Sequence, residues 1–386
     1  MVVVDLELDP GQRALCEEVR DWLADNTPRE PLPSLETRDG VEAHRDWEKK
    51  LFAAGLAAVH WPTEYGGRGL DPLSTALFNE EYIRAGAPER LNGLGLRLAG
   101  PTLIDVGSPE QQQRWLARIL ACDDLWCQGF SEPSAGSDLA AVRTRGEVSD
   151  DAVCVNGQKI WTSYSLWADW MFTLVRTDPD APKHRGLTFL MIDMRDPGVE
   201  VRPIVQINGQ REFSEVFLTD VVVPMENVVG GLGNGWKVAS RTLIHERGAG
   251  TSAEIFSRAL REVVDMLTPP QRSDPRVLEE IGALYEAIEA YRYMSLRTLS
   301  ELASDKTPGP QAAMGKLWWS QLQNRIFELG MRLLGPEAEL ADGADTSAPA
   351  DFRARYWFSR AALIFAGTSE IQRNIIAERV LGLPKG

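Results

Sequence analysis

The apolar residues of this chain change their spacing twice, and this change limits the possible folds more than any other feature of the sequence. From about Asp9 to Leu120 they recur at the spacing of a helix face, and from about Trp126 to Val229 the pattern is strand-like. From Trp236 onward the helical spacing returns. We therefore predict an α+β protein with three domains: an N-terminal helical domain (1–124), a middle β domain (125–235) and a C-terminal helical domain (236–386).

Apolar runs bounded by turn residues predict individual strands within the middle domain. Asn156-Gly157 follows Val153-Cys154-Val155 and is a dipeptide typical of a two-residue hairpin turn. Other strands are predicted at 125–130, 171–175, 187–192 and 216–218. In the C-terminal domain, helical spacing from Leu278 to Tyr291 predicts one long helix.

The charge and cysteine content exclude several classes of partner and location. The 386 residues carry a formal net charge of -15, and no run of lysine and arginine interrupts it. A chain this acidic repels nucleic acid and anionic membranes, so we expect neither as a partner. The four cysteines lack C-x-x-C spacing, and we find no signal peptide and no apolar run that could span a bilayer. We therefore expect a cytoplasmic protein with free thiols.

The most informative single residue is Glu246. It lies on an apolar stripe of helical spacing that begins near Trp236 and includes Ala239, Leu243, Gly250, Ala253, Phe256 and Leu260. A carboxylate on such a stripe faces packed protein or a ligand, and burial raises its pKa toward that of a general base. On spacing alone, the commoner explanation is a glutamate paired with a helix neighbour. Arg247 points to the side and need not neutralise it.

Two loops have the composition of ligand-binding loops. Ser131 to Asp138 follows a predicted strand, and its small and hydroxyl residues let backbone N–H groups approach phosphate or a flavin edge. Gly367-Thr368-Ser369-Glu370 precedes a predicted helix at 371–381 and forms a ready anion site. Taken alone, the first segment is also explained by an ordinary turn, and the second more simply by a helix N-cap.

Motifs of several other enzyme classes are missing from the sequence. Gly231 to Trp236 lacks the third glycine of G-x-G-x-x-G, which argues against a Rossmann dinucleotide site. The four histidines are scattered and form no cluster with cysteine, so no metal site is predicted. No G-x-S-x-G elbow and no G-K-[ST] loop occurs.

Four segments, taken in order, resemble the signatures of the acyl-CoA dehydrogenase family. They are Trp61 to Gly67, Phe130 to Asp138, Lys159 to Ser163 and Gly367 to Arg373. Each is modest alone, but their order and spacing over nearly the whole chain are specific. The resemblance implies an N-terminal helical domain, a middle β-barrel-like domain, a C-terminal four-helix bundle, bound FAD and usually a tetramer.

The same resemblance implies roles for particular residues. It places the flavin ring of FAD against Gln128, Phe130, Ser131, Trp161 and Ser163. It places the adenosine end of FAD near Thr368 and Glu370. It assigns the acyl-CoA substrate to Ser137, Arg247, Ala366 and Gly367, with Ser137 at the CoA arm.

Two departures from the family pattern bear on function. Many members place the catalytic glutamate directly before the Gly-Thr of the last signature, where this chain has Ala366. A minority, similar to heteromeric steroid- and lipid-degrading subunits of actinobacteria, carry it in a Glu-Arg pair like Glu246-Arg247. The chain also lacks an R-x-x-F-G segment near 270–275, and Arg332 replaces the glutamine of Q-x-L-G-G.

Together these features predict FAD-dependent α,β-dehydrogenation of an acyl-CoA thioester. Glu246 takes the Cα proton, flavin N5 takes the Cβ hydride, and the backbone N–H of residue 366 helps to stabilise the enolate oxygen. We expect an electron-transfer flavoprotein as the electron acceptor. A non-catalytic scaffold subunit is the competing function, favoured by Ala366, and an acyl-CoA oxidase ranks third. The acyl group is not readable, although a base on this helix indicates a wide pocket for branched or steroid side chains.

The altered FAD segments predict an assembly of two different subunits. In the family, each FAD is completed by the R-x-x-F-G and Q-x-L-G-G segments of a neighbouring subunit. We therefore expect a heterotetramer with a related subunit that carries these segments intact. The alternative is a homotetramer in which Arg332 takes over the phosphate contact.

Overall fold

A computed structural model describes residues 8–248, 252–303, 312–340 and 351–384, without the side chains of residues 246–248 and 303. Contacts between residues divide the chain into two units, each assembled from separate stretches of sequence. The bundle unit contains Met1–Thr27, Asp71–Ala87 and Arg247–Gly386. The sheet unit contains Pro28–Leu70 and Pro88–Glu246.

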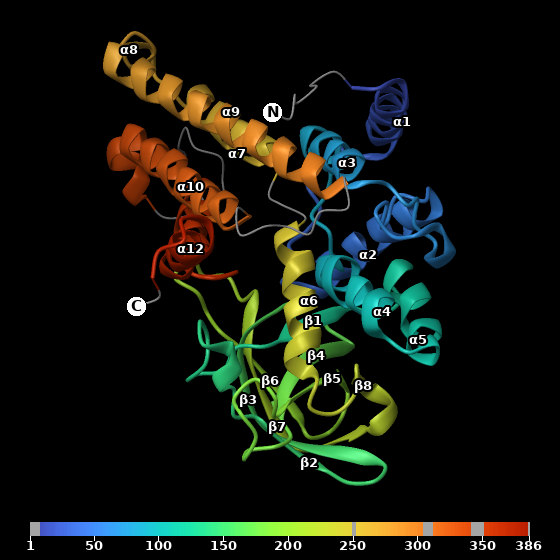
Figure 1. The fold of residues 1–386 in the computed structure, drawn as a ribbon. Coiled ribbons are helices and arrows are strands. Elements are labelled where there is room, and N and C mark those ends of the chain that lie inside the picture. The colour runs from blue at the N-terminus through green and yellow to red at the C-terminus, as the bar shows by residue number, and fades with distance from the viewer. Residues whose placement is uncertain (1–7, 249–251, 304–311, 341–350, 385–386) are drawn as a thin grey trace. The chain divides into compact units, whose positions relative to one another are not determined.

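The sheet unit is built around one eight-stranded sheet (Figure 1). Its order is β6-β7-β3-β2-β4-β5-β8, and β1 pairs with β4 off this path. β1 and β2 run parallel to β4, whereas the remaining pairs are antiparallel. The strands are β1 (Trp126–Gly129), β2 (Arg145–Val148), β3 (Ala152–Ser163), β4 (Trp170–Arg176), β5 (Leu187–Asp193), β6 (Val199–Pro203), β7 (Phe213–Pro224) and β8 (Val228–Val229).

The central strands form where the sequence predicts uninterrupted apolar runs. Six consecutive residues of β4 and six of β5 are buried, which is the pattern of strands covered on both faces. The predicted strands at 171–175, 187–192 and 216–218 are confirmed as parts of β4, β5 and β7.

The predicted hairpin turn at Asn156-Gly157 is wrong. β3 runs through this dipeptide, and the register with β7 shifts between Val155 and Gly157, as in a β-bulge. A Cβ on Gly157 would lie 2.7 Å from the Cα of Thr144. The glycine is therefore needed for a close approach of two backbones, and not for a reversal of the chain.

Helices complete the sheet unit and contain the first family-like segment. They are α2 (Arg38–Ala53), α4 (Gly100–Val106), α5 (Pro109–Leu120) and α6 (Gly235–Gly248), the last ending just inside the bundle unit. The buried Trp61 indole donates a hydrogen bond to the Leu96 carbonyl at 2.9 Å. Gly67 and Gly100 lie so close to Trp61 that an added Cβ would come within 2.0 Å of it. The glycine at the end of Trp61 to Gly67 is thus explained by packing against the tryptophan.

The bundle unit consists of helices packed on one apolar core (Figure 1). Long α9 and α10 pack with α7, and α1 and α3 join them from the N-terminal part of the chain. The core includes Phe256, Ile288, Tyr291, Ile326 and Phe352, each at most 2 % exposed. The helices are α1 (Pro10–Asn26), α3 (Pro72–Arg84), α7 (Ala253–Asp265), α8 (Pro269–Arg272), α9 (Pro275–Ala303), α10 (Ala312–Leu334), α11 (Phe352–Ser359) and α12 (Ser369–Ile375).

Local sequence signals explain where several of these helices begin. Asp9 and Gln12 form a capping box at the start of α1, and Pro10 occupies the first helical position. The long helix predicted through Leu278 to Tyr291 is confirmed as part of α9. Among the described residues, no helix combines the length and apolar character needed to cross a membrane.

Candidate cofactor and active site

In the sheet unit, a candidate ligand-binding surface lies where β1 runs into the loop that begins at Ser131. Gln128 is half-buried in β1, and Phe130 is 6 % exposed with its ring edge-on to Phe172 and Phe189. The Ile160 N–H donates to the Ser131 carbonyl at 3.0 Å. This bond fastens the loop to β3, and it brings together two of the family-like segments.

A buried ion pair joins the same two segments more firmly. The Lys159 ammonium is fully buried, and its Nζ lies 2.8 Å from Oε1 of Glu132. Lys159 also donates to the Leu174 carbonyl at 2.7 Å, and Glu132 accepts from the N–H groups of Arg143 and Thr144 at 2.6 and 2.9 Å. Burial alone would raise the pKa of Glu132, but Lys159 and these N–H groups outweigh it and hold that pKa below its ordinary value.

Trp161 presents an exposed indole on this surface. Its side chain is 55 % exposed, and its φ of 60° lies in the left-handed region, which a bulky residue rarely adopts. A register shift between β3 and β7 occurs at the same point, between Lys159 and Thr162. The indole contacts the Phe213 ring edge-on and is otherwise largely exposed, so it offers an aromatic surface to a flat ligand.

The predicted flavin residues of the sheet unit thus lie on two connected segments. Gln128, Phe130 and Ser131 lie at the end of β1, and Trp161 and Ser163 lie at the end of β3. Ser137 lies farther along the loop and is exposed, next to Asp138, which forms an ion pair with Lys183.

In the bundle unit, a separate candidate ligand-binding segment lies at the turn before α12. Ala366 and Gly367 both have left-handed backbones, with φ of 53° and 88°. The Gln372 amide donates to both of their carbonyls at 3.2 Å. The Thr368 hydroxyl caps α12 by accepting from the Ile371 N–H. Sequence reasoning did not assign a role to Gln372, the residue that holds this turn.

Glu370 is exposed in the first turn of α12. Its own backbone N–H and the Thr368 hydroxyl hold the pKa of its carboxyl below the ordinary value. Arg373 lies one turn later, with Nη1 3.4 Å from Oε1 of Glu370. Glu370 is therefore an ionised side chain on the surface of the bundle unit.

Each unit, taken by itself, has a buried hydroxyl that fits a contact with a large polar cofactor such as FAD. In the sheet unit, the Thr162 hydroxyl is buried next to Trp161 and has no hydrogen-bond partner among the described residues. In the bundle unit, the same holds for the Ser369 hydroxyl, which follows the Thr368 cap. Buried polar atoms are normally paired, so each orphan is an available contact for a bound molecule. Within the described residues, no cluster of His, Cys, Asp and Glu is suited to a metal ion.

The predicted base, Glu246, lies in α6, two residues before this helix ends at Gly248. The side chains of Glu246 and Arg247 lie outside the described residues. On the preceding turns, Ala239 and Thr242 are fully buried and Leu243 is half-buried.

The apolar stripe used to predict Glu246 spans two helices instead of one. α6 ends at Gly248, and α7 starts at Ala253. The Ser252 hydroxyl accepts from the Glu254 N–H and caps the new helix. The stripe positions on α7, Ala253, Phe256 and Leu260, are buried in the bundle core, and Gly250 lies outside the described residues.

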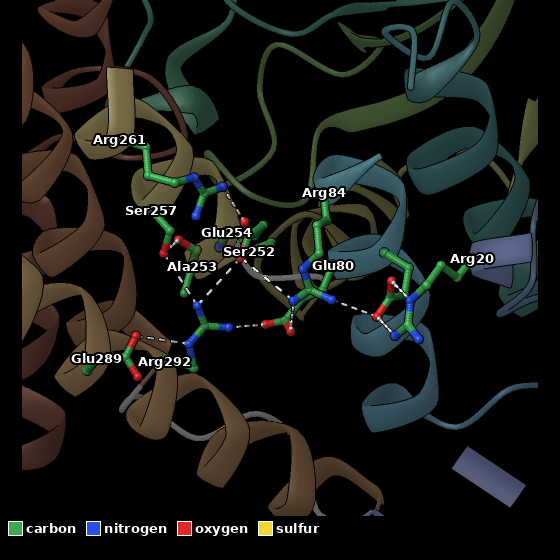
Figure 2. A network of polar contacts seen from close by, with 11 residues as sticks. Arg20, Glu80, Arg84, Ser252, Ala253, Glu254, Ser257, Arg261, Glu289 and Arg292 are labelled. Atoms are coloured by element: carbon green, nitrogen blue, oxygen red, sulfur yellow. Dashed lines mark hydrogen bonds and ion pairs between the residues drawn. The ribbon is translucent and has the colours of Figure 1, made fainter. Parts of the chain in front are cut away.

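A network of ion pairs fixes the start of α7 within the bundle unit, as Figure 2 shows. Glu254, in the first turn, is 4 % exposed and lies 2.7 Å from Nη2 of Arg261, 3.7 Å from Arg292 and 3.8 Å from Arg84. Further pairs extend the network to α1, α3 and α9 through Arg20, Glu80, Glu81 and Glu289. Glu254 lies on a helix of apolar spacing much like that of Glu246, and the sequence alone does not distinguish the structural carboxylate from a catalytic one.

A second cluster that the sequence did not predict follows directly after Ser163. Tyr164 is half-buried; its hydroxyl donates to Oε1 of Glu89 at 2.6 Å, and its N–H donates to the Glu212 carbonyl at 2.9 Å. These residues line a cavity of about 340 Å³ in the sheet unit, together with His44 and Trp167. Burial, reinforced by the charge of Glu89, raises the pKa of Glu212 to about 7.

Comparison with known proteins identifies the class to which this fold belongs. Residues 9–123 match the N-terminal domain of acyl-CoA dehydrogenases, residues 127–221 the middle domain, and residues 233–381 the C-terminal domain. The chain therefore belongs to the acyl-CoA dehydrogenase family. The predicted family and the predicted order of helical, β-sheet and helical domains are confirmed.

Individual members of this family are similar to the chain over nearly its whole length. It is 42 % identical over 378 residues to the acyl-CoA dehydrogenase IpdE1 of Mycobacterium tuberculosis, covering 95 % of this chain and 97 % of that protein. A solved structure described as the Tcur3481-Tcur3483 steroid ACAD superposes with a TM-score of 0.86 at 27 % identity, over 99 % of this chain and 100 % of that one. The ChsE4-ChsE5 complex of M. tuberculosis gives 0.85 at 30 % identity, with the same coverage. The predicted enzyme class, acyl-CoA dehydrogenase, agrees with the names of these relatives.

Proposed function

We propose that this chain is a catalytic subunit that binds FAD and oxidises the Cα–Cβ bond of an acyl-CoA thioester. The observation that carries the proposal is the pair of positions 246 and 366. Glu246 lies in α6, on which Ala239 and Thr242 of the preceding turns are buried, and position 366 has an alanine that cannot accept a proton. The chain thus offers one carboxylate at the two places where its family places a base.

In this proposal the chain's own residues bind, orient and take up a proton. Trp161 supplies an aromatic face for the flavin, and Gln128, Ser131 and Ser163 contact its edge. FAD, when bound, supplies the acceptor for the Cβ hydride. Glu246 takes the Cα proton, and the Ala366 N–H donates to the thioester oxygen as negative charge develops there.

The remaining predicted contacts belong to the two long ligands. Ser137 meets the CoA arm, and Arg247 and Gly367 line the acyl-CoA site. Thr368 and Glu370 lie toward the adenosine end of FAD. Electrons then leave to an electron-transfer flavoprotein, and we propose the cytoplasm as the compartment.

The test is the substitution Glu246→Gln, which keeps the size and hydrogen bonding of the side chain but removes the basic site. It should lower turnover by about 10²-fold or more, because general-base catalysis typically contributes that much. FAD content and substrate binding should stay near wild type. The matched control is Glu226→Gln, at a surface carboxylate that is 71 % exposed. Wild-type turnover in the Glu246→Gln protein would refute the assignment.

A non-catalytic scaffold subunit is the second candidate, and Ala366 is the observation that favours it. The two candidates differ in one measurement, which is turnover of the purified assembly before and after Glu246→Gln. A scaffold subunit predicts no difference, because the partner subunit would then contain the only base.

We propose that the substrate carries a bulky, ring-containing acyl group. The support is the likeness to a structure described as a steroid ACAD. A panel of CoA thioesters with straight, branched and steroid-derived acyl groups tests this point. A preference for straight chains in kcat/KM would contradict it.

We propose a heterotetramer with a related subunit, because the segments that should complete a neighbouring FAD are altered. Where R-x-x-F-G is expected, the chain forms the short helix α8, and Gln271 in it donates to the Leu333 carbonyl at 2.7 Å. Arg332, which replaces the family glutamine, forms an ion pair with Glu280. Arg332 is therefore already paired, which weighs against the homotetramer in which it binds phosphate. The relatives ChsE4 and ChsE5 are described as a complex.

The test of the assembly is the mass and FAD content of the chain, purified alone and after co-expression with related subunits encoded beside it. One FAD per pair of chains, appearing only on co-expression, is the expected result. A homotetramer with one tightly bound FAD per chain and full activity would rule out the partner.

A further inference from the structure

Helix α6 lies beside α4 within the sheet unit (Figure 1). A side-chain hydrogen bond joins the two helices one turn before Glu246. The hydroxyls of Thr102 and Thr242 lie 2.8 Å apart, and both residues are fully buried. The Thr242 hydroxyl also lies 3.2 Å from the Val238 carbonyl, and either threonine hydroxyl can be the donor between the two helices. A paired hydroxyl in a buried position fixes the sliding and rotation of one helix against the other.

A second attachment between the same helices lies directly beside Glu246. Nε2 of His245 lies 2.9 Å from Oδ2 of Asp105, in the last full turn of α4. Nη1 of Arg241, one turn earlier on α6, lies 3.9 Å from the same oxygen. Asp105 thus faces two side chains of α6 that are separated by one helical turn.

These attachments act on the part of α6 that would otherwise be least fixed. The helix runs to Gly248, and the carbonyl groups in the last turn of a helix have no hydrogen-bond partners within the helix, unlike those of its interior. The backbone N–H of residue 246 pairs with the carbonyl of Thr242 in α-helical geometry. Thr242 lies one turn before Glu246, and His245 is the residue before it. Contacts that hold these two residues therefore also restrict the backbone of Glu246.

We propose that Asp105 and His245 are positioning residues, which hold the end of α6 so that the Glu246 carboxylate meets the substrate Cα–H. This inference rests on the proposed role of Glu246 as the base. A proton transfer from carbon needs the base within hydrogen-bond reach, and a displacement of about 1 Å costs roughly 10²-fold in rate. Asp105 and His245 need not touch the substrate to have this effect.

The contact between Asp105 and His245 should contribute little to the free energy of unfolding. An effect of its removal on kcat can therefore be told apart from an effect on stability. The Asp105 and His245 side chains are 34 % and 28 % exposed, and a partly exposed polar pair of this kind adds at most about 1 kcal/mol to stability. Removing the pair should therefore leave a folded, FAD-loaded protein. The expected loss is about 10-fold in kcat with less than about 2-fold change in KM, because the substrate contacts are made elsewhere.

The experiment compares four variants of the FAD-loaded protein with an artificial electron acceptor. His245→Ala and Asp105→Ala should each lower kcat about 10-fold, and His245→Gln should recover most of it, because the amide N–H still reaches Asp105. The control is His184→Ala, which removes a ring 4.7 Å from Trp236 at the opposite end of α6. The control should keep wild-type kcat.

Combination with Glu246→Gln separates this inference from the proposed function. If the pair acts through Glu246, adding His245→Ala to Glu246→Gln should cause no further loss of kcat. A further 10-fold loss in the double variant would overturn the positioning role, as would a wild-type kcat in His245→Ala alone. If Glu246→Gln itself keeps full turnover, the proposed base is wrong, and the inference is refuted with it. If Glu246→Gln is impaired and His245→Ala is not, only the positioning role is refuted.

Discussion

Removing the ammonium of Lys159 should destabilise the sheet unit and release the loop at Ser131. In Lys159→Met the apolar stem is kept, but Glu132 loses the cation 2.8 Å away while remaining 6 % exposed. The two N–H groups of Arg143 and Thr144 still contact it, and they only partly replace a full charge. Breaking one side of a buried ion pair costs about 3–5 kcal/mol. That loss is a large fraction of the roughly 5–15 kcal/mol by which a domain is stable.

The assay is urea unfolding followed by tryptophan fluorescence, with FAD retention measured on the same samples by flavin absorbance. The shift of the midpoint multiplied by the slope gives the loss of free energy. A surface control, Arg195→Met, removes an exposed pair with Asp193 and should cost less than about 1 kcal/mol. The double variant Glu132→Gln with Lys159→Met should regain part of the loss, because no unpaired charge is then buried. A Lys159→Met protein within about 0.5 kcal/mol of wild type would refute this reasoning.

Three further predictions concern other charged and aromatic residues. Because burial raises the pKa of Glu212 to about 7 from an ordinary 4.5, its contribution to stability is complete below about pH 4.5 and is lost as pH rises through 7. Unfolding free energies of wild type and Glu212→Gln should therefore diverge by about 3 kcal/mol between pH 4.5 and 8, and parallel curves would contradict this. Glu254→Gln should lower the free energy of unfolding by about 2 kcal/mol, a moderate loss because the guanidinium groups around it are partly exposed. It should also speed hydrogen exchange at the start of α7, and unchanged exchange there would count against an anchoring role. Trp161→Ala should leave unfolding unchanged within about 0.5 kcal/mol and weaken FAD binding about 10-fold, and equal FAD affinity by fluorescence titration would exclude a flavin contact.

Much of the fold follows from the sequence because the spacing of apolar residues is set by the geometry of each element. β4 and β5 are continuous apolar runs that are buried on both faces, and they lie where the pattern predicts strands. The hairpin turn predicted at Asn156-Gly157 is wrong because the same dipeptide occurs both in hairpin turns and at β-bulges. The deciding contact is with Thr144, in another segment of the chain.

The sequence predicts which segments form the candidate site, but it does not predict the contacts that hold those segments in place. Trp161 and Thr368 are found from motif resemblance, but the reasons for their geometry lie elsewhere. Lys159 reads as one polar residue in a strand, and only its distance from Glu132 reveals an ion pair. Likewise Glu254 and Glu246 have similar surroundings in the sequence, and the three arginines that neutralise Glu254 come from three different helices.

The division of the chain into two interleaved units has a consequence for the order in which the protein is made. The chain passes between the units at residues 27/28, 70/71, 87/88 and 246/247. Helices α1 and α3 leave the ribosome first, yet α3 packs against α7 and α9, which follow more than 150 residues later. The sheet unit is complete at Glu246, so it can fold during synthesis while the N-terminal helices wait for partners. Truncation after the sheet unit would therefore leave α3 without α7 and α9, which pack against it, and such a fragment should need chaperones or aggregate.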